Sequence, residues 1–159
     1  MELDPSALAS ALEASPLGVA MRGSRGAYPA ANVAHVVGLV FLVGAIGVVD
    51  LRVMGFGRAV PLAPLSRFLT PIAVAGFAVL LTSGALLFTA DAGPLTRSAM
   101  FQVKMGLSVL ALGNALVFRR WFGDGRHGGE APPVARAMAG ASLAAWLTVA
   151  CLGRLIAYS

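Results

Sequence analysis

Four long apolar blocks constrain this chain more than any other feature of its sequence. They cover residues 31–50, 68–90, 99–118 and 135–157. A helix rises about 1.5 Å per residue, so each block is close to the roughly 20 residues that cross a hydrocarbon core of about 30 Å. Strands of a membrane barrel would instead alternate apolar and polar residues over about 10 residues. The blocks do not alternate, and we therefore predict an all-α integral membrane four-helix bundle.

Composition supports a membrane protein and argues against a soluble domain. Of the 159 residues, 58% are hydrophobic and 12% are charged, whereas soluble domains have about 25% charged residues. The net charge of +5 does not indicate nucleic-acid binding, because the basic residues lie at the ends of the blocks and between them, where orientation signals occur. The expected partner is therefore the lipid bilayer. Motifs for nucleotide binding, zinc binding or hydrolysis are absent from the sequence, so we predict no enzymatic activity.

Residues 1–30 are predicted to form a segment of their own before the four-helix transmembrane domain of residues 31–159. Asp4 and Ser15 each precede a proline, a pattern that begins a helix. Two short amphipathic helices are therefore expected here, lying on the membrane surface. The alternative is a frayed tail.

The basic residues predict the orientation of the spans. Seven of them lie around the loops that follow the first and third spans: Arg52, Arg58, Arg67, Arg119, Arg120, Arg126 and Arg136. The other five lie toward the opposite side, and two of these are inside spans. Cytoplasmic loops carry an excess of lysine and arginine. Both termini are therefore expected in the periplasm of a bacterial inner membrane.

Small residues predict the faces on which the helices pack, because they let transmembrane helices approach closely. The last three spans each have one such stripe: Ala73, Gly76 and Ser83; Gln102, Gly106 and Gly113; and Gly140, Ala144, Leu147, Cys151, Arg154 and Tyr158. We expect all three stripes to pack inside one compact bundle.

Three ionisable residues near the periplasmic ends of the spans form the candidate site. His35, Lys104 and Arg154 each lie about one helical turn inside a span, and Tyr158 is at the same level. Ionisable residues inside a membrane are costly and are functional candidates by default. Gly38 shares a helix face with His35 and would leave a hollow below the imidazole. A flat ligand such as heme b or a quinone ring would fit there, with His35 as metal ligand and the cations on its polar groups.

The alternative interpretation of this layer is structural. His35 would form a hydrogen bond with a neighbouring helix, and Gly38 would permit close packing. Lys104 and Arg154 would extend to the lipid headgroups.

The cytoplasmic end of the spans is expected to be held by a charge pair. Asp50 and Arg52 end the first span, and Asp50 is predicted to pair with a loop arginine such as Arg119. Asn114, about one turn from the same end, is expected to tie the third span to a neighbour.

An ordered set of short motifs gives the chain a resemblance to a known family. The motifs are Tyr28-Pro29, His35-Val36-Val37-Gly38, Asp50-Leu51-Arg52, Gly76-Phe77, Phe101 to Lys104, Asn114 to Phe118, and Gly153 to Tyr158. Together they resemble, over roughly residues 16–159, a family of uncharacterised four-helix bacterial inner-membrane proteins known only as a domain of unknown function. The resemblance implies the fold and these residues, and it implies no activity. Members often have a histidine at the position of Arg119.

We expect a small inner-membrane subunit or anchor of a redox or transport assembly, without catalysis of its own. Its partners would be other membrane protein subunits or further copies of the chain. One alternative is a b-type cytochrome or quinone-binding electron carrier with its site at His35. Another is periplasmic copper handling through the same histidine.

Overall fold

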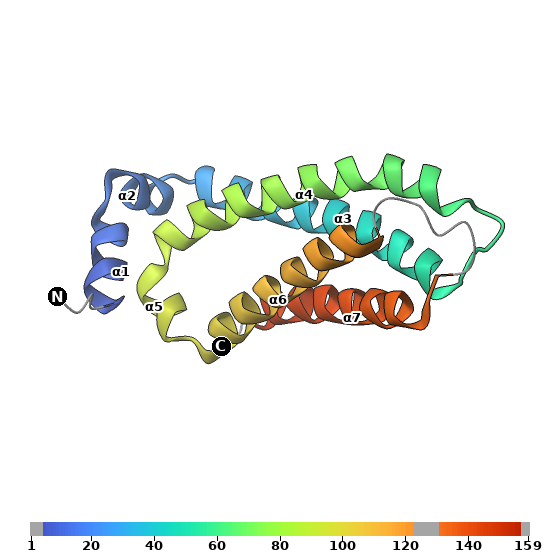
Figure 1. The fold of residues 1–159 in the computed structure, drawn as a ribbon. Helices are drawn as coiled ribbons and strands as arrows, with labels where there is room; N and C mark the ends of the chain where they lie inside the picture. Colours follow the sequence, from blue (N-terminus) through green and yellow to red (C-terminus); the bar gives the residue numbers. More distant parts are fainter. Residues whose placement is uncertain (1–4, 123–130, 157–159) are drawn as a thin grey trace.

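The computed structural model describes residues 5–122 and 131–156, which form helices and no strands (Figure 1). The helices are α1 (Pro5–Ala14), α2 (Pro16–Gly23), α3 (Ala27–Met54), α4 (Leu62–Ala90), α5 (Ala92–Arg97), α6 (Ala99–Phe122) and α7 (Pro133–Leu155). Four of them, α3, α4, α6 and α7, are long and apolar enough to cross a membrane. The predicted all-α architecture with four spans is thereby confirmed.

Local sequence signals set several helix boundaries. The Ser15 hydroxyl accepts a hydrogen bond from the amide of Gly18 at 3.1 Å, which caps α2. Gly55 ends α3 with a φ of 109°, a left-handed conformation that glycine adopts without a steric penalty. Pro133 is the first residue of α7, where its missing N–H costs no helix hydrogen bond. The spans α3 and α4 have 28 and 29 residues and are thus longer than the apolar blocks, because the residues that flank the blocks, including Arg52 and Arg67, are helical as well.

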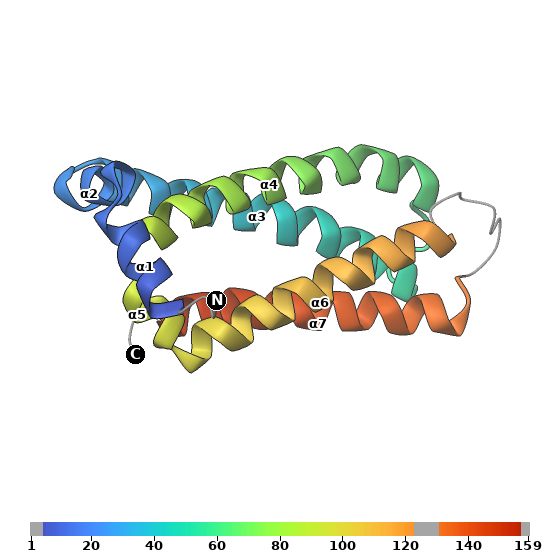
Figure 2. The same cartoon turned by 60° about the vertical axis from the view of Figure 1, so that its left-hand side comes forward.

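The four spans pack as two pairs. α3 and α4 contact each other along their length, α6 packs on α7, and the pairs are joined where α7 contacts α3 (Figures 1 and 2). The backbones of α4 and α6 lie further apart, and the rings of Phe88 and Phe101 stack between these two helices with their centroids 5.7 Å apart. The α3–α4 pair is the tightest because Gly38 and Gly76 meet there: a Cβ atom on Gly38 would lie 2.8 Å from the carbonyl oxygen of Gly76.

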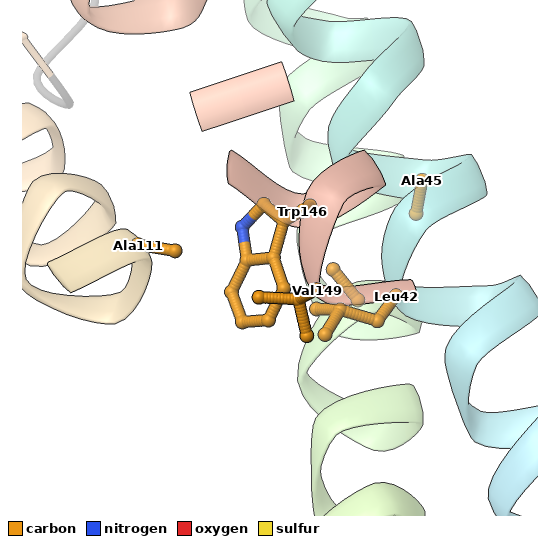
Figure 3. Packing of buried hydrophobic residues seen from close by; sticks show 6 residues of the cluster. Leu42, Ala45, Ala111, Trp146 and Val149 are labelled. Atoms are coloured by element: carbon orange, nitrogen blue, oxygen red, sulfur yellow. The ribbon is translucent and has the colours of Figure 1, made fainter. Parts of the chain in front are cut away.

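A cluster of buried side chains joins all four spans at the centre of the bundle. Its members are Leu42, Ala45, Ala73, Ala111, Trp146 and Val149. The Trp146 indole, 3% exposed, lies between Ala111 of α6 and Leu42 of α3, as Figure 3 shows. One large side chain from α7 therefore fills much of the space between the two pairs.

Only one of the three predicted small-residue stripes packs as expected. On α4, Ala73, Gly76 and Ser83 are all buried, which confirms that prediction. On α7 the prediction is wrong, since Leu147 is 49% exposed and Cys151 is exposed as well. The buried face of α7 instead consists of Ala135, Ala139, Ser142, Trp146 and Val149. Burial of the large indole turns this face inward, and the small-residue stripe faces outward.

The stripe on α6 also faces away from the bundle. A Cβ atom on Gly106 or Gly113 would meet no atom of another described segment within 4 Å, and the Gln102 side chain is exposed. The prediction that this stripe packs within the chain is therefore wrong.

The N-terminal helices α1 and α2 are docked on the end of the bundle that is formed by α4 and α5. Three hydrogen bonds hold this end together. Arg22 donates to the carbonyl of Ala90 at 2.9 Å, and the amide of Gly93 donates to the Glu13 carboxylate at 2.7 Å. The Tyr28 hydroxyl donates to the Asp91 carboxylate at 2.8 Å. The two predicted helices are present, and they pack on the bundle end instead of forming a frayed tail.

Candidate functional site

His35 lies near the start of α3 and faces α4. Its Nδ1 atom is 3.0 Å from the hydroxyl of Ser83. That hydroxyl is also 2.6 Å from the carbonyl oxygen of Val79, to which it donates its single hydrogen. Nδ1 must therefore donate to Ser83, which assigns the hydrogen of the neutral ring to Nδ1 and leaves Nε2 as an acceptor.

The imidazole of His35 rests on the backbone of α4. A Cβ atom on Gly84 would lie 3.1 Å from the Cε1 atom of the ring. One turn further along α3, the hollow that was expected beside Gly38 is filled by α4, because a Cβ there would lie 2.9 Å from the amide nitrogen of Leu80. Gly38 is thus a point of close helix contact and offers no room for a flat ligand.

The two cations of the predicted layer lie on the other pair of helices. The Lys104 side chain on α6 extends over Gly153 of α7, with its Nζ atom 3.4 Å from the position of a Cβ there. Arg154 follows Gly153 and is exposed. Tyr158 lies outside the described residues. The structure therefore brings Lys104 to the end of α7 that carries Arg154 and within electrostatic reach of His35, while the ring of His35 itself packs on α4.

No cluster of three or more histidine, cysteine, aspartate or glutamate side chains occurs within residues 5–122 and 131–156. His127, the other histidine of the chain, lies outside this part. What the structure shows at His35 is one hydrogen bond across the α3–α4 interface and close packing on Gly84.

Asp50, at the opposite end of α3, has no arginine partner among the described residues. The residue is 8% exposed, its carboxyl group is hydrogen-bonded by Ser142 of α7, and its Oδ2 atom has no hydrogen-bond partner. The guanidinium of Arg52 instead donates to the carbonyl of Val60 at 2.6 Å. The predicted charge pair of Asp50 with Arg52 or Arg119 is therefore not formed.

Helix geometry explains this correction. Arg52 lies two residues after Asp50, about 200° around the helix, and so points to the other side of α3. It reaches the α3–α4 loop, whose carbonyl groups lack helical partners. Arg119 is exposed at the end of α6.

Two polar contacts between spans complete the picture. The side-chain amide of Asn114 donates to the carbonyl of Met138 at 3.0 Å and ties α6 to α7, as predicted. Ser83 was expected only as a packing residue, and its role as the partner of His35 was missed. The depth of the two residues in their spans could have indicated it, because both lie within about two turns of the same end.

Comparison with known protein families shows to which family the chain belongs. A model of a family described as a family of unknown function, DUF6644, matches residues 10–159. The chain belongs to the DUF6644 family. The resemblance inferred from the motifs is thereby confirmed. Searches of curated proteins and of solved structures found no match. The DUF6644 match covers α2 to α7 completely and the second half of α1, so α2 and the four spans belong to the same family domain.

Proposed function

We propose that this DUF6644 protein is a non-catalytic subunit or anchor of a redox or transport assembly in the bacterial inner membrane. The observation that supports this proposal is the outward face of α6. In the most apolar stretch of α6, only 6% of the residues are buried, whereas 33% are buried in the corresponding stretch of α3. The helix therefore leaves most of its surface to lipid or to a partner.

Residue types on this face favour a partner helix over lipid alone. Gly106 and Gly113 lie on the same side of α6 and are open to the outside. Gln102 lies about one turn before Gly106 and about three turns before Gly113. Its amide nitrogen donates to the carbonyl of Thr96 at 2.8 Å, and its amide oxygen is available as an acceptor. Small residues let a second helix approach, and an amide can form a hydrogen bond with it. A spanning helix of another subunit or of a second copy would fit this face.

The orientation in the membrane is part of the proposal. The end of the bundle that contains the α3–α4 loop and the last turn of α6 carries Arg52, Arg58, Arg67, Arg119, Arg120 and Arg136. By the positive-inside rule this end faces the cytoplasm. The opposite end, where α1, α2 and α5 dock, then faces the periplasm. A reporter fused at residue 60 should report a cytoplasmic location, and a reporter fused at residue 93 should report a periplasmic one. The reverse pattern would contradict this orientation.

Substitutions on α6 test the subunit proposal. The chain is extracted from its native membrane in a mild detergent, and the mass of its complex is measured by native mass spectrometry. Gly106→Leu and Gly113→Leu should release the chain as a monomer, because the new side chains hold the partner helix away. Gly44→Leu is the matched control, since Gly44 on α3 is equally open. A parent chain that is already monomeric, or leucine variants that keep the complex, would contradict the proposal.

The alternatives based on His35 receive no such support. A b-type cytochrome would need room for the porphyrin beside Gly38, and α4 fills that room. Periplasmic copper handling would use His35 as a ligand, and the described residues place no group of three or more histidine, cysteine, aspartate or glutamate side chains around it.

A further inference from the structure

A cavity of about 720 Å³ lies between the four spans, in the half of the bundle that contains the α3–α4 loop. Val74 of α4 and Leu116 of α6 line it and are 60% and 61% exposed, so the cavity opens outward between these two helices. Toward the other end of the bundle, the stacked rings of Phe88 and Phe101 bridge the same two helices. In a membrane the opening faces the acyl chains, so a molecule reaches the cavity from the lipid.

The length and the polarity of the cavity match one leaflet of a bilayer. Along α4 its wall runs from Ser66 to Phe77, which is about 16 Å at about 1.5 Å per residue. Half of a hydrocarbon core of about 30 Å is about 15 Å. The wall is polar toward the α3–α4 loop, with Arg67, Thr70 and Arg119, and it is apolar toward the centre of the bundle, with Leu42, Phe77 and Leu112. A phospholipid has the same order of a polar headgroup and an apolar chain.

Two arginines give the polar end of the cavity a positive charge. Arg67 of α4 and Arg119 of α6 line the wall from the two helices that flank the opening. Within residues 5–122 and 131–156, neither guanidinium group has a hydrogen-bond or ion-pair partner. Guanidinium groups bind phosphate oxygens through strong, charge-assisted hydrogen bonds. The polar end of the cavity is therefore suited to a phosphate group.

Asp50, the acidic residue in the wall, does not offset this charge. Its carboxyl group is hydrogen-bonded by Ser142 of α7, and its Oδ2 atom is inaccessible to water. The carboxyl group is thus not placed to bind the ammonium or choline group of a zwitterionic lipid. A headgroup with a net negative charge fits better, because both of its charges are then met by arginine and no cationic group lacks a partner.

We infer that this cavity binds an anionic phospholipid with the chemistry of phosphatidylglycerol, whose phosphate lies between Arg67 and Arg119 and whose acyl chain lies among the apolar side chains. Basic pockets between spanning helices bind anionic lipid headgroups in this way. The second acyl chain stays in the bilayer outside the opening. Gly106 and Gly113 do not line the cavity, so the lipid site does not depend on a partner subunit at the outward face of α6.

Fluorescence quenching by brominated lipids tests this site, because Trp146 lines the cavity. The variant Trp121→Phe keeps Trp146 as its only tryptophan and is reconstituted in nanodiscs of phosphatidylcholine. Phosphatidylglycerol with bromine atoms in the middle of its acyl chains then replaces part of the lipid. Quenching of Trp146 should saturate at a low fraction of this lipid, and unbrominated phosphatidylglycerol should reverse it. Brominated phosphatidylcholine should need at least about a tenfold higher fraction for the same quenching.

Arginine variants in the same Trp121→Phe background separate the cavity from a general attraction of anionic lipid to the basic end of the bundle. Arg67→Gln and Arg119→Gln should each raise the fraction of brominated phosphatidylglycerol at half-maximal quenching about fivefold. Arg120→Gln is the matched control, since Arg120 carries the same charge at the neighbouring position and does not line the cavity. This control should leave the fraction at half-maximal quenching unchanged.

Three results would overturn the inference: equal quenching by the two brominated lipids, equal effects of the Arg119 and Arg120 variants, or quenching that grows only in proportion to the fraction of brominated lipid. The comparison of the two lipids uses one protein with both arginines in place. It therefore decides the question even if an arginine variant does not fold.

Discussion

The contact between Gly38 and Gly76 makes the sharpest stability prediction, and Gly38→Ala is the perturbation that tests it. A Cβ atom on Gly38 would lie 2.8 Å from the Gly76 oxygen and 2.9 Å from the Leu80 nitrogen, against 3.4 Å for ordinary van der Waals contact. Both obstructing atoms belong to the backbone of α4, so no side chain can rotate away. The α3–α4 pair must separate by several tenths of an ångström to accept one methyl group.

The expected magnitude follows from two opposing effects. An alanine in a helix interior is favoured over glycine by about 0.5–1 kcal/mol through the backbone entropy of the unfolded chain. Overpacking of a close interface costs about 1–3 kcal/mol. Gly44→Ala is the matched control on the same helix, because its Cβ would meet nothing within 4 Å. The difference between the two variants is then the overpacking cost alone, about 1–3 kcal/mol.

Thermal unfolding in nanodiscs, followed by the intrinsic fluorescence of the buried Trp146, measures this difference. Gly38→Ala should melt below the parent protein, and Gly44→Ala should melt at or above it. Gly76→Ala should behave like Gly38→Ala, and the double variant should cost less than the sum, since the helices need to separate only once. If the Gly38 and Gly44 variants melt alike, the two glycines do not meet, and the packing of α3 on α4 is incorrect.

Three further predictions concern polar contacts. Asp50→Asn should leave the melting temperature unchanged or raise it. The reason is that no ion pair is broken, and a buried carboxyl group is replaced by an uncharged amide of the same shape. A marked fall in the melting temperature would reveal a charged partner of Asp50. Ser83→Ala should lower the free energy of unfolding by about 1 kcal/mol, because the hydrogen bond with His35 is lost. Thr82→Ala is the control and should lower it less, since the Thr82 hydroxyl bonds within its own helix. Equal losses of stability in thermal unfolding would contradict the assigned bond. Glu13→Ala should increase amide hydrogen exchange in α1 and α2. Glu13→Gln should not increase it, because the glutamine keeps an acceptor for the Gly93 amide. Unchanged exchange in the alanine variant would mean that this contact does not hold the N-terminal helices.

The spans and their number could be predicted from the sequence because the bilayer imposes a simple rule. A run of about 20 apolar residues has few alternatives to a spanning helix. The same rule says little about which face of a helix points inward. All faces of a spanning helix are apolar, so burial leaves no amphipathic pattern to detect. The stripe through Leu147 and Cys151 was therefore predicted to face the interior of the bundle, although the residue of α7 that lies in the interior is Trp146.

The candidate site was predicted less well for a related reason. Proximity to the same membrane surface placed His35, Lys104 and Arg154 in one layer, but depth alone does not decide which helices are neighbours. In the structure His35 turns to Ser83 on α4, and Lys104 turns to Gly153 on α7. The carboxyl group of Asp50 on α3 instead meets Ser142 on α7, a residue 92 positions away in the sequence. This contact depends on the way in which α3 meets α7, and no local pattern shows it.

Photocrosslinking in living cells tests the central claim, that the outward face of α6 binds a partner helix. A photoreactive amino acid replaces Gly106 in one variant and Gly44 in another, and adducts are resolved by mass after irradiation. The proposal predicts a protein adduct of defined mass from position 106, either a second copy or another subunit, and none from position 44. Absence of a protein adduct at position 106, or the same adducts at both positions, would show that lipid alone covers α6 and would contradict the subunit proposal.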